Sequence, residues 1–266
     1  MKPAIIEVTR TSKAFGGVAA NREVTLHVQE GSITALIGPN GSGKTTLFNS
    51  IAGYHPIDSG SIRFEGREIS RLGVQQIARL GLVRTFQQTR VFARMSCSDN
   101  MLIAAPHRGH GWRDMIGRHP RALVDKAGRL LEFVGLHAKR RLAAGSLSFG
   151  QQRLLEFAMA LMNDPKLLLL DEPTAGINPT LINGLLDRLK SANRELGVTL
   201  FVIEHNMRVV MNLADRVYCM SRGEMLAEGP PARIQNDPRV IEAYLGRGSA
   251  AQQHGMVDES ASAPAA

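Results

Sequence analysis

The strongest constraint on the fold of this chain is a glycine-rich loop that separates an apolar run from a helical pattern. The apolar run, Ile33 to Ile37, has the length of a buried strand, and the helical spacing starts near Thr46 and ends at Gly53. The loop reads Gly38-Pro39-Asn40-Gly41-Ser42-Gly43-Lys44-Thr45, which matches the pattern G-x-x-x-x-G-K-[ST]. A strand, this loop and a helix in that order predict an α/β fold with a phosphate-binding site at one edge of its sheet.

The loop has the chemistry that a nucleotide phosphate chain requires. Its glycines let the backbone curl so that successive N–H groups point inward at phosphate oxygens, and the following helix adds its positive N-terminal end. We expect Lys44 to reach the β- and γ-phosphates and the Thr45 hydroxyl to join a Mg²⁺ shell. The residues from Gly38 to Thr46 are therefore the predicted nucleotide-binding residues.

Other segments show strand and helix patterns in a regular order. Alternating apolar residues on both sides of the turn Phe15-Gly16-Gly17 predict two N-terminal strands. Residues 86–160 are basic and mostly helical in pattern, whereas buried strands return at Lys166–Leu170, Thr199–Ile203 and Arg216–Met220. A helix after the first of these is expected to bury one face, made by Leu181, Leu185, Leu189 and Leu196. Apolar strands alternating with helices indicate a parallel sheet covered on both faces.

Composition excludes several other classes of protein. The 266 residues are 44% hydrophobic and 21% charged, which argues against a disordered, collagen-like or coiled-coil chain. Apolar runs such as Leu167–Leu170 fall far short of the ~20 residues of a membrane-spanning helix, and no signal peptide is expected. Cys97 and Cys219 lie far apart, which favours a reducing cytosolic setting. The net charge of +8 favours a polyanionic partner without choosing one.

Two acidic residues follow the run Leu167–Leu170, and a histidine comes at the end of the next predicted strand. Carboxylates at the end of a buried strand are costly unless they meet cations or hydrogen bonds. We expect Asp171 to hold Mg²⁺ and Glu172 to polarise the attacking water. A lone histidine often only ends a strand, but the position of His205 beyond the acidic pair favours a hydrogen bond to the γ-phosphate. Glu172, His205 and Lys44 are the predicted catalytic residues.

A second motif, Leu147-Ser148-Phe149-Gly150-Gln151, precedes the acidic pair. Ser148 with Gln151 three residues later makes a capping box and predicts the start of a helix. A capped helix that begins with serine and glycine also attracts an anion, so the same residues are able to seat a γ-phosphate.

The order of these motifs closely resembles that of the ATPase subunits of ABC transporters, over nearly the whole chain. The resemblance implies an α/β, P-loop NTPase (RecA-like) fold, in which a parallel-sheet core carries an N-terminal antiparallel β subdomain and an inserted helical subdomain. The implied ABC ATPase domain spans 1–246, with the core at 1–85 and 161–246 and the helical signature subdomain at 86–160. Residues 247–266, rich in Ala, Ser and Gln, are expected to be a disordered tail.

In that family the signature motif of one subunit contacts ATP held by the phosphate loop of another. The resemblance therefore implies a head-to-tail dimer, in which the ATP site of the partner is completed by Ser148, Phe149, Gly150 and Gln151. The segment Ala175–Asn178 falls where the family usually has Ser-Ala-Leu-Asp, so Asn178 removes a charge from this contact between subunits.

The resemblance also assigns ligands for ATP and Mg²⁺. It places Gln87 beside Thr45 and Asp171 as a Mg²⁺ ligand, with the adjacent Gln88 as an alternative register. Phe15 matches the aromatic residue that stacks on adenine, although an aromatic residue at this strand–turn junction suits the core equally well.

Within the family the chain is most similar to bacterial uptake ATPases for branched-chain, or hydrophobic, amino acids. The segments behind this similarity are Val83–Gln87, Ala175–Asn178, Ile203–Met207 and Asn236–Gly246. The similarity implies a second ABC ATPase subunit as partner, in a heterodimer rather than a homodimer, together with integral membrane permease subunits and, indirectly, a solute-binding protein. It also implies a peripheral position on the cytoplasmic face of the inner membrane.

Two other functions compete with this interpretation. ATPases of export or lipid-transport systems carry overlapping motifs. Soluble ABC proteins that act on nucleic acid usually have two ATPase domains or long coiled-coil arms, which this chain lacks, so no nucleic-acid partner is expected.

Two further groups of residues also have a structural interpretation that requires no function. The apolar residues Phe86, Val91, Phe92 and Met95 suit either a groove for a cytoplasmic helix of a membrane subunit or core packing. The histidines His107, His110 and His119 have no carboxylate or thiol companion, so a solvated loop is expected there rather than a metal site.

Overall fold

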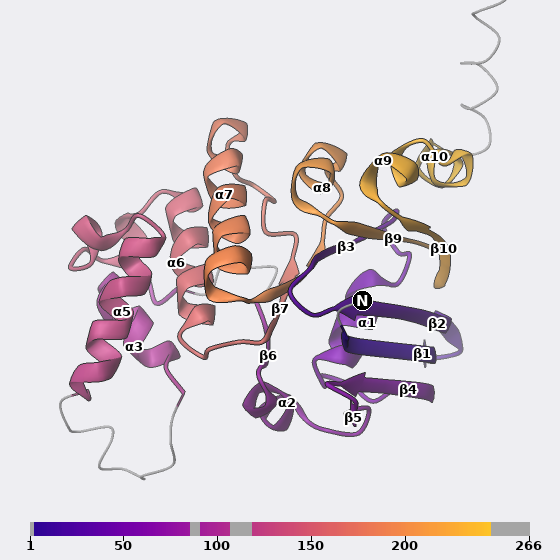
Figure 1. Cartoon of the computed structure of the whole chain (residues 1–266), viewed down its shortest axis with the longest axis horizontal. Helices are drawn as coiled ribbons and strands as arrows, with labels where there is room; N and C mark the ends of the chain where they lie inside the picture. Colours follow the sequence, from indigo (N-terminus) through magenta and orange to yellow (C-terminus); the bar gives the residue numbers. More distant parts are fainter. Residues whose placement is uncertain (1–2, 86–90, 107–118, 246–266) are drawn as a thin grey trace, which may run out of the picture.

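The N-terminal strands form one of two sheets in the computed structural model, which describes residues 3–85, 91–106 and 119–245 (Figure 1). This first sheet is antiparallel with the order β2-β1-β4-β5. Its strands are β1 (Ala4–Phe15), β2 (Val18–Gln29), β4 (Ser59–Phe64) and β5 (Arg67–Glu68). The predicted antiparallel β part and its turn after Phe15 are thus confirmed.

The second sheet has six strands in the order β10-β9-β3-β8-β7-β6. Five of them are parallel, namely β3 (Ile33–Ile37), β6 (Leu82–Arg84), β7 (Leu167–Asp171), β8 (Thr199–Ile203) and β9 (Arg216–Ser221). The edge strand β10 (Glu224–Gly229) runs antiparallel to β9 and was not predicted. It follows a two-residue turn, Arg222-Gly223, in which both residues have positive φ, as a tight hairpin requires.

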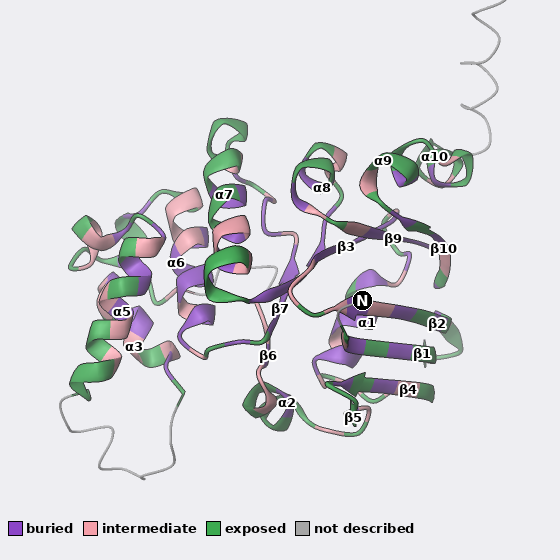
Figure 2. Ribbon diagram, in the orientation of Figure 1, coloured by how far each residue is buried: buried purple, intermediate pink, exposed green. Residues whose placement is uncertain are grey.

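Helices cover both faces of the second sheet, and its central strands are buried throughout (Figure 2). On one face, α1 (Lys44–Ile51) lies between the two sheets and packs on Leu167 and Leu169. On the other face, α6 (Phe149–Leu161), α7 (Pro179–Leu196) and α8 (Met207–Leu213) pack on Leu168 and Leu170. Successive side chains of β7 therefore point alternately into two apolar layers. Because both faces of the strand are buried, all four of these positions are leucine.

The predicted buried face of α7 is correct only in its middle. Leu185 and Leu189 are buried, but Leu181 is 51% and Leu196 is 46% exposed. Both lie near the ends of an 18-residue helix, away from the buried middle that packs on the sheet. Helical periodicity identifies the face but not how much of its length finds a partner.

Three α-helices and two short 3-10 helices, His137–Lys139 and Ala144–Ser146, make up the described part of the helical segment. α3 (Cys97–Ala104), α5 (Arg121–Phe133) and α6 share one apolar core with the outer face of the sheet. Val91 packs against this core, whereas Phe92 is exposed. His119 is exposed as expected, and Phe86, His107 and His110 lie outside the described residues.

Shorter helices complete the chain. α2 (Val74–Leu80) precedes β6, and α9 (Pro231–Gln235) and α10 (Pro238–Leu245) lie over the edge formed by β9 and β10 (Figure 1). None of the helices in the described ranges is long and apolar enough to cross a bilayer. The expected tail, 247–266, lies outside those ranges.

Candidate nucleotide site

The phosphate loop connects β3 to α1, as its sequence predicts, and close packing requires its glycines. Gly38 has φ +146°, and a Cβ there would lie 2.1 Å from the carbonyl oxygen of Met220 on β9. Gly43 has φ +98°, and a Cβ there would lie 2.2 Å from the carbonyl oxygen of Ala20 on β2. The loop is therefore clamped between the two sheets at positions where only glycine fits.

Lys44 is held inside this loop by backbone carbonyls. Its Nζ donates to the carbonyl oxygen of Gly38 at 2.8 Å and to that of Pro39 at 3.0 Å. An ammonium group has three donors; the third is directed only weakly, to Ser42 Oγ at 3.5 Å, so the two shorter bonds aim the side chain. Burial lowers the pKa of Lys44, while the nearby carboxylates of Glu172 and Asp171 act in the opposite direction.

Asp171, at the end of β7, is paired with a cation that sequence reasoning missed. The Arg84 guanidinium at the end of β6 donates to Asp171 Oδ2 at 2.7 Å, and both side chains are buried. Arg84 also donates to the Asn49 side chain of α1 and lies 5.5 Å from the ring centroid of Tyr54. The available signal was a charged residue ending a short apolar strand, since such a charge needs a buried partner.

Glu172 and His205 meet because β7 and β8 are neighbours. Asp171 pairs in register with Ile203, so the residues beyond each strand come together at one edge of the sheet. His205 Nδ1 lies 3.8 Å from Glu172 Oε1. Glu172 has φ +49°, a left-handed backbone that non-glycine residues seldom adopt, and its N–H donates to the Ile203 carbonyl at 3.0 Å. This backbone turns the Glu172 carboxylate toward His205.

Glu204 is a second residue that sequence reasoning missed. It is only 1% exposed, and its Oε1 accepts from the Thr174 N–H at 3.1 Å and from the Thr174 hydroxyl at 2.6 Å. Its Oε2 accepts from the N–H of His205 at 3.2 Å. One buried carboxylate thus joins the segment after Glu172 to the segment that carries His205.

The signature motif begins α6 with the predicted capping box. Ser148 Oγ accepts from the Gln151 N–H at 3.4 Å, and Gln151 Oε1 accepts from the Ser148 N–H at 3.2 Å. Phe149 is exposed, and its ring lies 3.1 Å from where a Cβ on Gly176 would sit. Among the residues that the structure describes, the segment 148–151 makes no hydrogen bond to the phosphate loop of its own chain.

The segment after Glu172 lies against this signature motif. A Cβ on Gly150 would lie 3.5 Å from Leu181 and 3.7 Å from Ile177. Asn178 caps α7, because its Oδ1 accepts from the N–H of Thr180 at 3.1 Å. The signature residues and this segment therefore form one continuous surface.

The remaining predicted ligands lie at the rim of the loop or outside the described residues. Phe15 is 49% exposed at the end of β1, which contradicts the core alternative for its ring. The edge of that ring meets His55 at a centroid distance of 5.2 Å, and Lys13 Nζ lies 5.3 Å from its centroid. Thr45 is exposed at the start of α1, whereas Gln87 and Gln88 lie outside the described residues.

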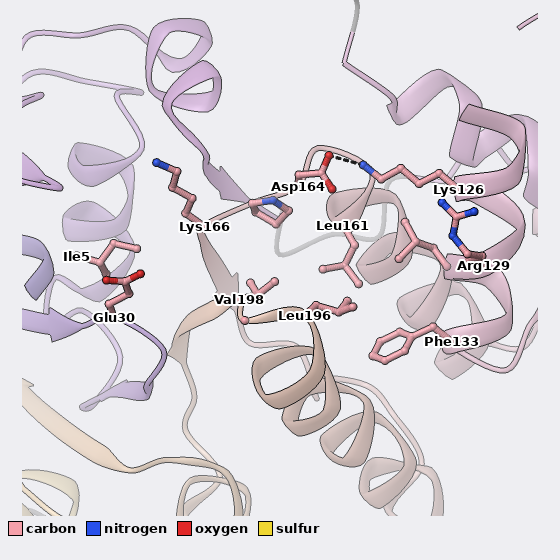
Figure 3. Close-up of a pocket in the computed structure, with 13 residues that line it drawn as sticks. Ile5, Glu30, Lys126, Arg129, Phe133, Leu161, Asp164, Lys166, Leu196 and Val198 are labelled. Atoms are coloured by element: carbon pink, nitrogen blue, oxygen red, sulfur yellow. Dashed lines mark hydrogen bonds and ion pairs between the residues drawn. The ribbon is translucent and has the colours of Figure 1, made fainter. Parts of the chain in front are cut away.

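A large cavity lies away from these residues (Figure 3). It has a volume of about 720 Å³ and is lined by residues of α5, including Phe133, and by Lys166 and Val198. Lys166 and Val198 directly precede β7 and β8, so the cavity is at the opposite strand ends from Glu172 and His205. It is not part of the nucleotide site.

A phosphate loop on a parallel sheet, with Asp171, Glu172 and His205 at the ends of neighbouring strands, defines the class of the protein as a P-loop ATPase. A family model described as ABC transporter matches residues 21–175. A second model, described as branched-chain amino acid ATP-binding cassette transporter, matches residues 224–250. The chain belongs to the ABC transporter ATP-binding proteins, and it is an ATPase subunit.

Curated relatives from archaea and bacteria agree with this assignment. The chain is 41% identical to the probable branched-chain amino acid transport ATP-binding protein LivG of Archaeoglobus fulgidus, over 91% of this chain and 95% of the relative. It is 40% identical to the high-affinity branched-chain amino acid transport ATP-binding protein BraF of Pseudomonas aeruginosa, over 92% and 99%. LivG of Escherichia coli is 38% identical over the same shares.

Solved structures of ATP-binding cassettes share the fold. The ADP conformation of MJ1267, an ATP-binding cassette of an ABC transporter, has a TM-score of 0.84 and 33% identity, covering 92% of this chain and 100% of that one. A nucleotide-free ATP-binding cassette has a TM-score of 0.83 with the same identity and coverage. The predicted P-loop NTPase fold is thereby confirmed.

Proposed function

We propose that this subunit hydrolyses Mg·ATP to drive a membrane importer for branched-chain or related amino acids. The hydrolytic part rests on one observation: Glu172 and His205 face each other beside the phosphate loop. The amino-acid part rests on the names of relatives that align with more than nine tenths of the chain.

In this proposal the loop binds the phosphates through its backbone N–H groups and through the Lys44 ammonium, whose long contact with Ser42 Oγ at 3.5 Å is exchanged for a phosphate oxygen. The Thr45 hydroxyl and the Asp171 carboxylate are hard oxygen donors of the kind that Mg²⁺ prefers, and only one oxygen of Asp171 is engaged by Arg84. These residues fit a Mg²⁺ ion that is completed by phosphate oxygens, with Gln87 as a further ligand. When bound, Mg²⁺ neutralises charge on the β- and γ-phosphates.

Glu172 then orients the attacking water and accepts its proton, since its carboxylate is turned toward the open strand edge. His205, 3.8 Å away from it, hydrogen-bonds the γ-phosphate. Glu204 keeps the two groups in register through Thr174 and the His205 N–H.

The ATP site becomes complete when a second ABC subunit closes over it. Ser148 and Phe149 are exposed and Gly150 and Gln151 are half-buried, and together these four residues would seat the γ-phosphate of the partner. ATP drives this closure only through its preference for the closed state. A heterodimer is proposed, attached to permease subunits at the cytoplasmic face of the inner membrane and supplied by a solute-binding protein.

Uptake of labelled leucine tests the proposal in cells that carry either the wild-type chain or Glu172→Gln at equal expression. Loss of uptake in the variant alone is expected. Equal uptake, with purified wild-type protein still hydrolysing ATP, would reject leucine as the cargo and leave the ATPase in place.

A further inference from the structure

The C-terminal helix α10 reaches the phosphate loop through one side chain. The Tyr244 Oη accepts from the N–H of Gly38 at 2.8 Å, although the two residues are 206 positions apart. Gly38 is the first residue of the loop, and its carbonyl oxygen accepts from Lys44 Nζ at 2.8 Å. Tyr244 is thus two hydrogen bonds away from the amine that faces the phosphates.

Packing holds α10 in the position that this contact needs. Val240, one helical turn before Tyr244, is buried in a cluster that includes Ile37, Cys219 and Ile234. Residues four apart lie on the same helix face, so anchoring Val240 directs Tyr244 toward the same part of the sheet. Ile37 is the last residue of β3 and directly precedes Gly38, and this cluster therefore joins α10 to the start of the loop.

The hydroxyl of Tyr244 lies in a shielded environment even though the residue as a whole is partly exposed. Burial raises the pKa of Tyr244 to about 12, and the Gly38 N–H opposes that rise. Gly38 is itself a buried residue, and a Cβ there would meet the Met220 carbonyl. A buried N–H that loses its acceptor is costly, so the loop would leave this geometry if the hydroxyl were removed.

We propose that Tyr244 is a positioning residue for ATP binding: its hydroxyl, carried by α10, fixes the first peptide of the phosphate loop and so preorganises Lys44. The inference rests on the proposed nucleotide site and assigns the C-terminal segment a part in it. A preorganised loop pays less ordering entropy when the nucleotide binds. The contribution of Tyr244 is therefore expected in nucleotide affinity rather than in the chemical step.

Tyr244→Phe tests this, because it removes one oxygen and keeps the ring that packs beside Val240. We expect the Kd for Mg·ATP, measured by calorimetry on the full chain, to rise about fivefold to tenfold, as loss of one buried hydrogen bond implies. The KM should rise by a similar factor, while kcat should change less than twofold.

Tyr218→Phe is the matched control. Tyr218 is fully buried, and its hydroxyl donates to the His27 carbonyl at 2.9 Å and accepts from the His27 N–H at 3.3 Å, away from the phosphate loop. This variant should lower the midpoint of thermal unfolding and leave the Kd for Mg·ATP unchanged, which separates a structural effect from a positioning effect.

Three outcomes decide the matter. A raised Kd in Tyr244→Phe alone supports the inference. If the wild-type protein binds Mg·ATP and the Kd of Tyr244→Phe equals the wild-type Kd, the inference is overturned and the proposed function stands. The same holds if the Kd rises equally in Tyr244→Phe and Tyr218→Phe. Wild-type protein that fails to bind Mg·ATP overturns the proposed function and this inference together.

Discussion

Arg84 and Asp171 form a buried ion pair at the carboxyl ends of two adjacent parallel strands, with 2.7 Å between Nη2 and Oδ2. The pair fixes the orientation of the Asp171 carboxylate, the expected Mg²⁺ ligand, before a nucleotide binds. It also joins β6, which leads into the helical segment, to β7, which leads to Glu172.

Removal of the Arg84 guanidinium should destabilise the fold strongly. Arg84→Met leaves the Asp171 carboxylate buried without its cation, at a cost of about 3–5 kcal/mol in the free energy of unfolding. Urea denaturation of the isolated chain measures this. The double variant Arg84→Met/Asp171→Asn should lose less than the sum of the two single variants, and strict additivity would show that the pair is not coupled.

Replacement of Glu172 by Gln should keep ATP binding and slow hydrolysis by about 10²–10⁴-fold, because the amide cannot accept the proton of the attacking water. Phosphate release by the purified protein measures this rate. Glu195→Gln, at an exposed position of α7, is the matched control and should behave as wild type. Near-normal turnover in Glu172→Gln would remove Glu172 from its proposed role.

A bulky cation in the signature motif should block the association of two subunits. Ser148 is exposed and caps α6. Ser148→Arg is therefore expected to leave ATP binding by the isolated chain intact. It should abolish the ATPase activity of the assembled transporter and the uptake that depends on it. Unchanged ATPase activity in the assembled transporter would contradict the ATP-sandwich arrangement.

The buried carboxylate of Glu204 should matter for both stability and catalysis. Glu204→Gln replaces one acceptor oxygen with a donor amide opposite the Thr174 or His205 N–H, which should cost about 1–3 kcal/mol of unfolding free energy. ATP turnover should fall as His205 loses its register with Glu172, while the Kd for Mg·ATP should stay near the wild-type value. Wild-type turnover would show that Glu204 supports only the fold.

Much of the nucleotide site was predictable because its parts are local in sequence. The glycines at 38, 41 and 43 are followed directly by Lys44, and the loop that they form needs only the strand before it and the helix after it. The runs Leu167–Leu170 and Thr199–Ile203 indicated buried strands by composition alone, and both are strands of the sheet. The capping box at Ser148 is also a contact between residues three positions apart.

The predictions were wrong, or none was made, where the environment of a residue depends on the order of the strands and on neighbours that are distant in sequence. Periodicity did not show that Leu181 and Leu196, near the ends of α7, stay about half exposed, and a two-residue turn was enough to add the edge strand β10. A charged residue ending a short strand, such as Arg84, has no visible partner until β6 and β7 are known to be adjacent.

The sequence by itself determined the phosphate loop, the strands that carry the acidic pair and His205, and the family. Only the tertiary structure paired Arg84 with Asp171 across 87 positions, Thr174 with Glu204 across 30 and Gly38 with Tyr244 across 206. The physical reason is that backbone conformation follows from local residue types and apolar patterns, whereas the partner of a buried polar group is chosen by the packing of the whole chain.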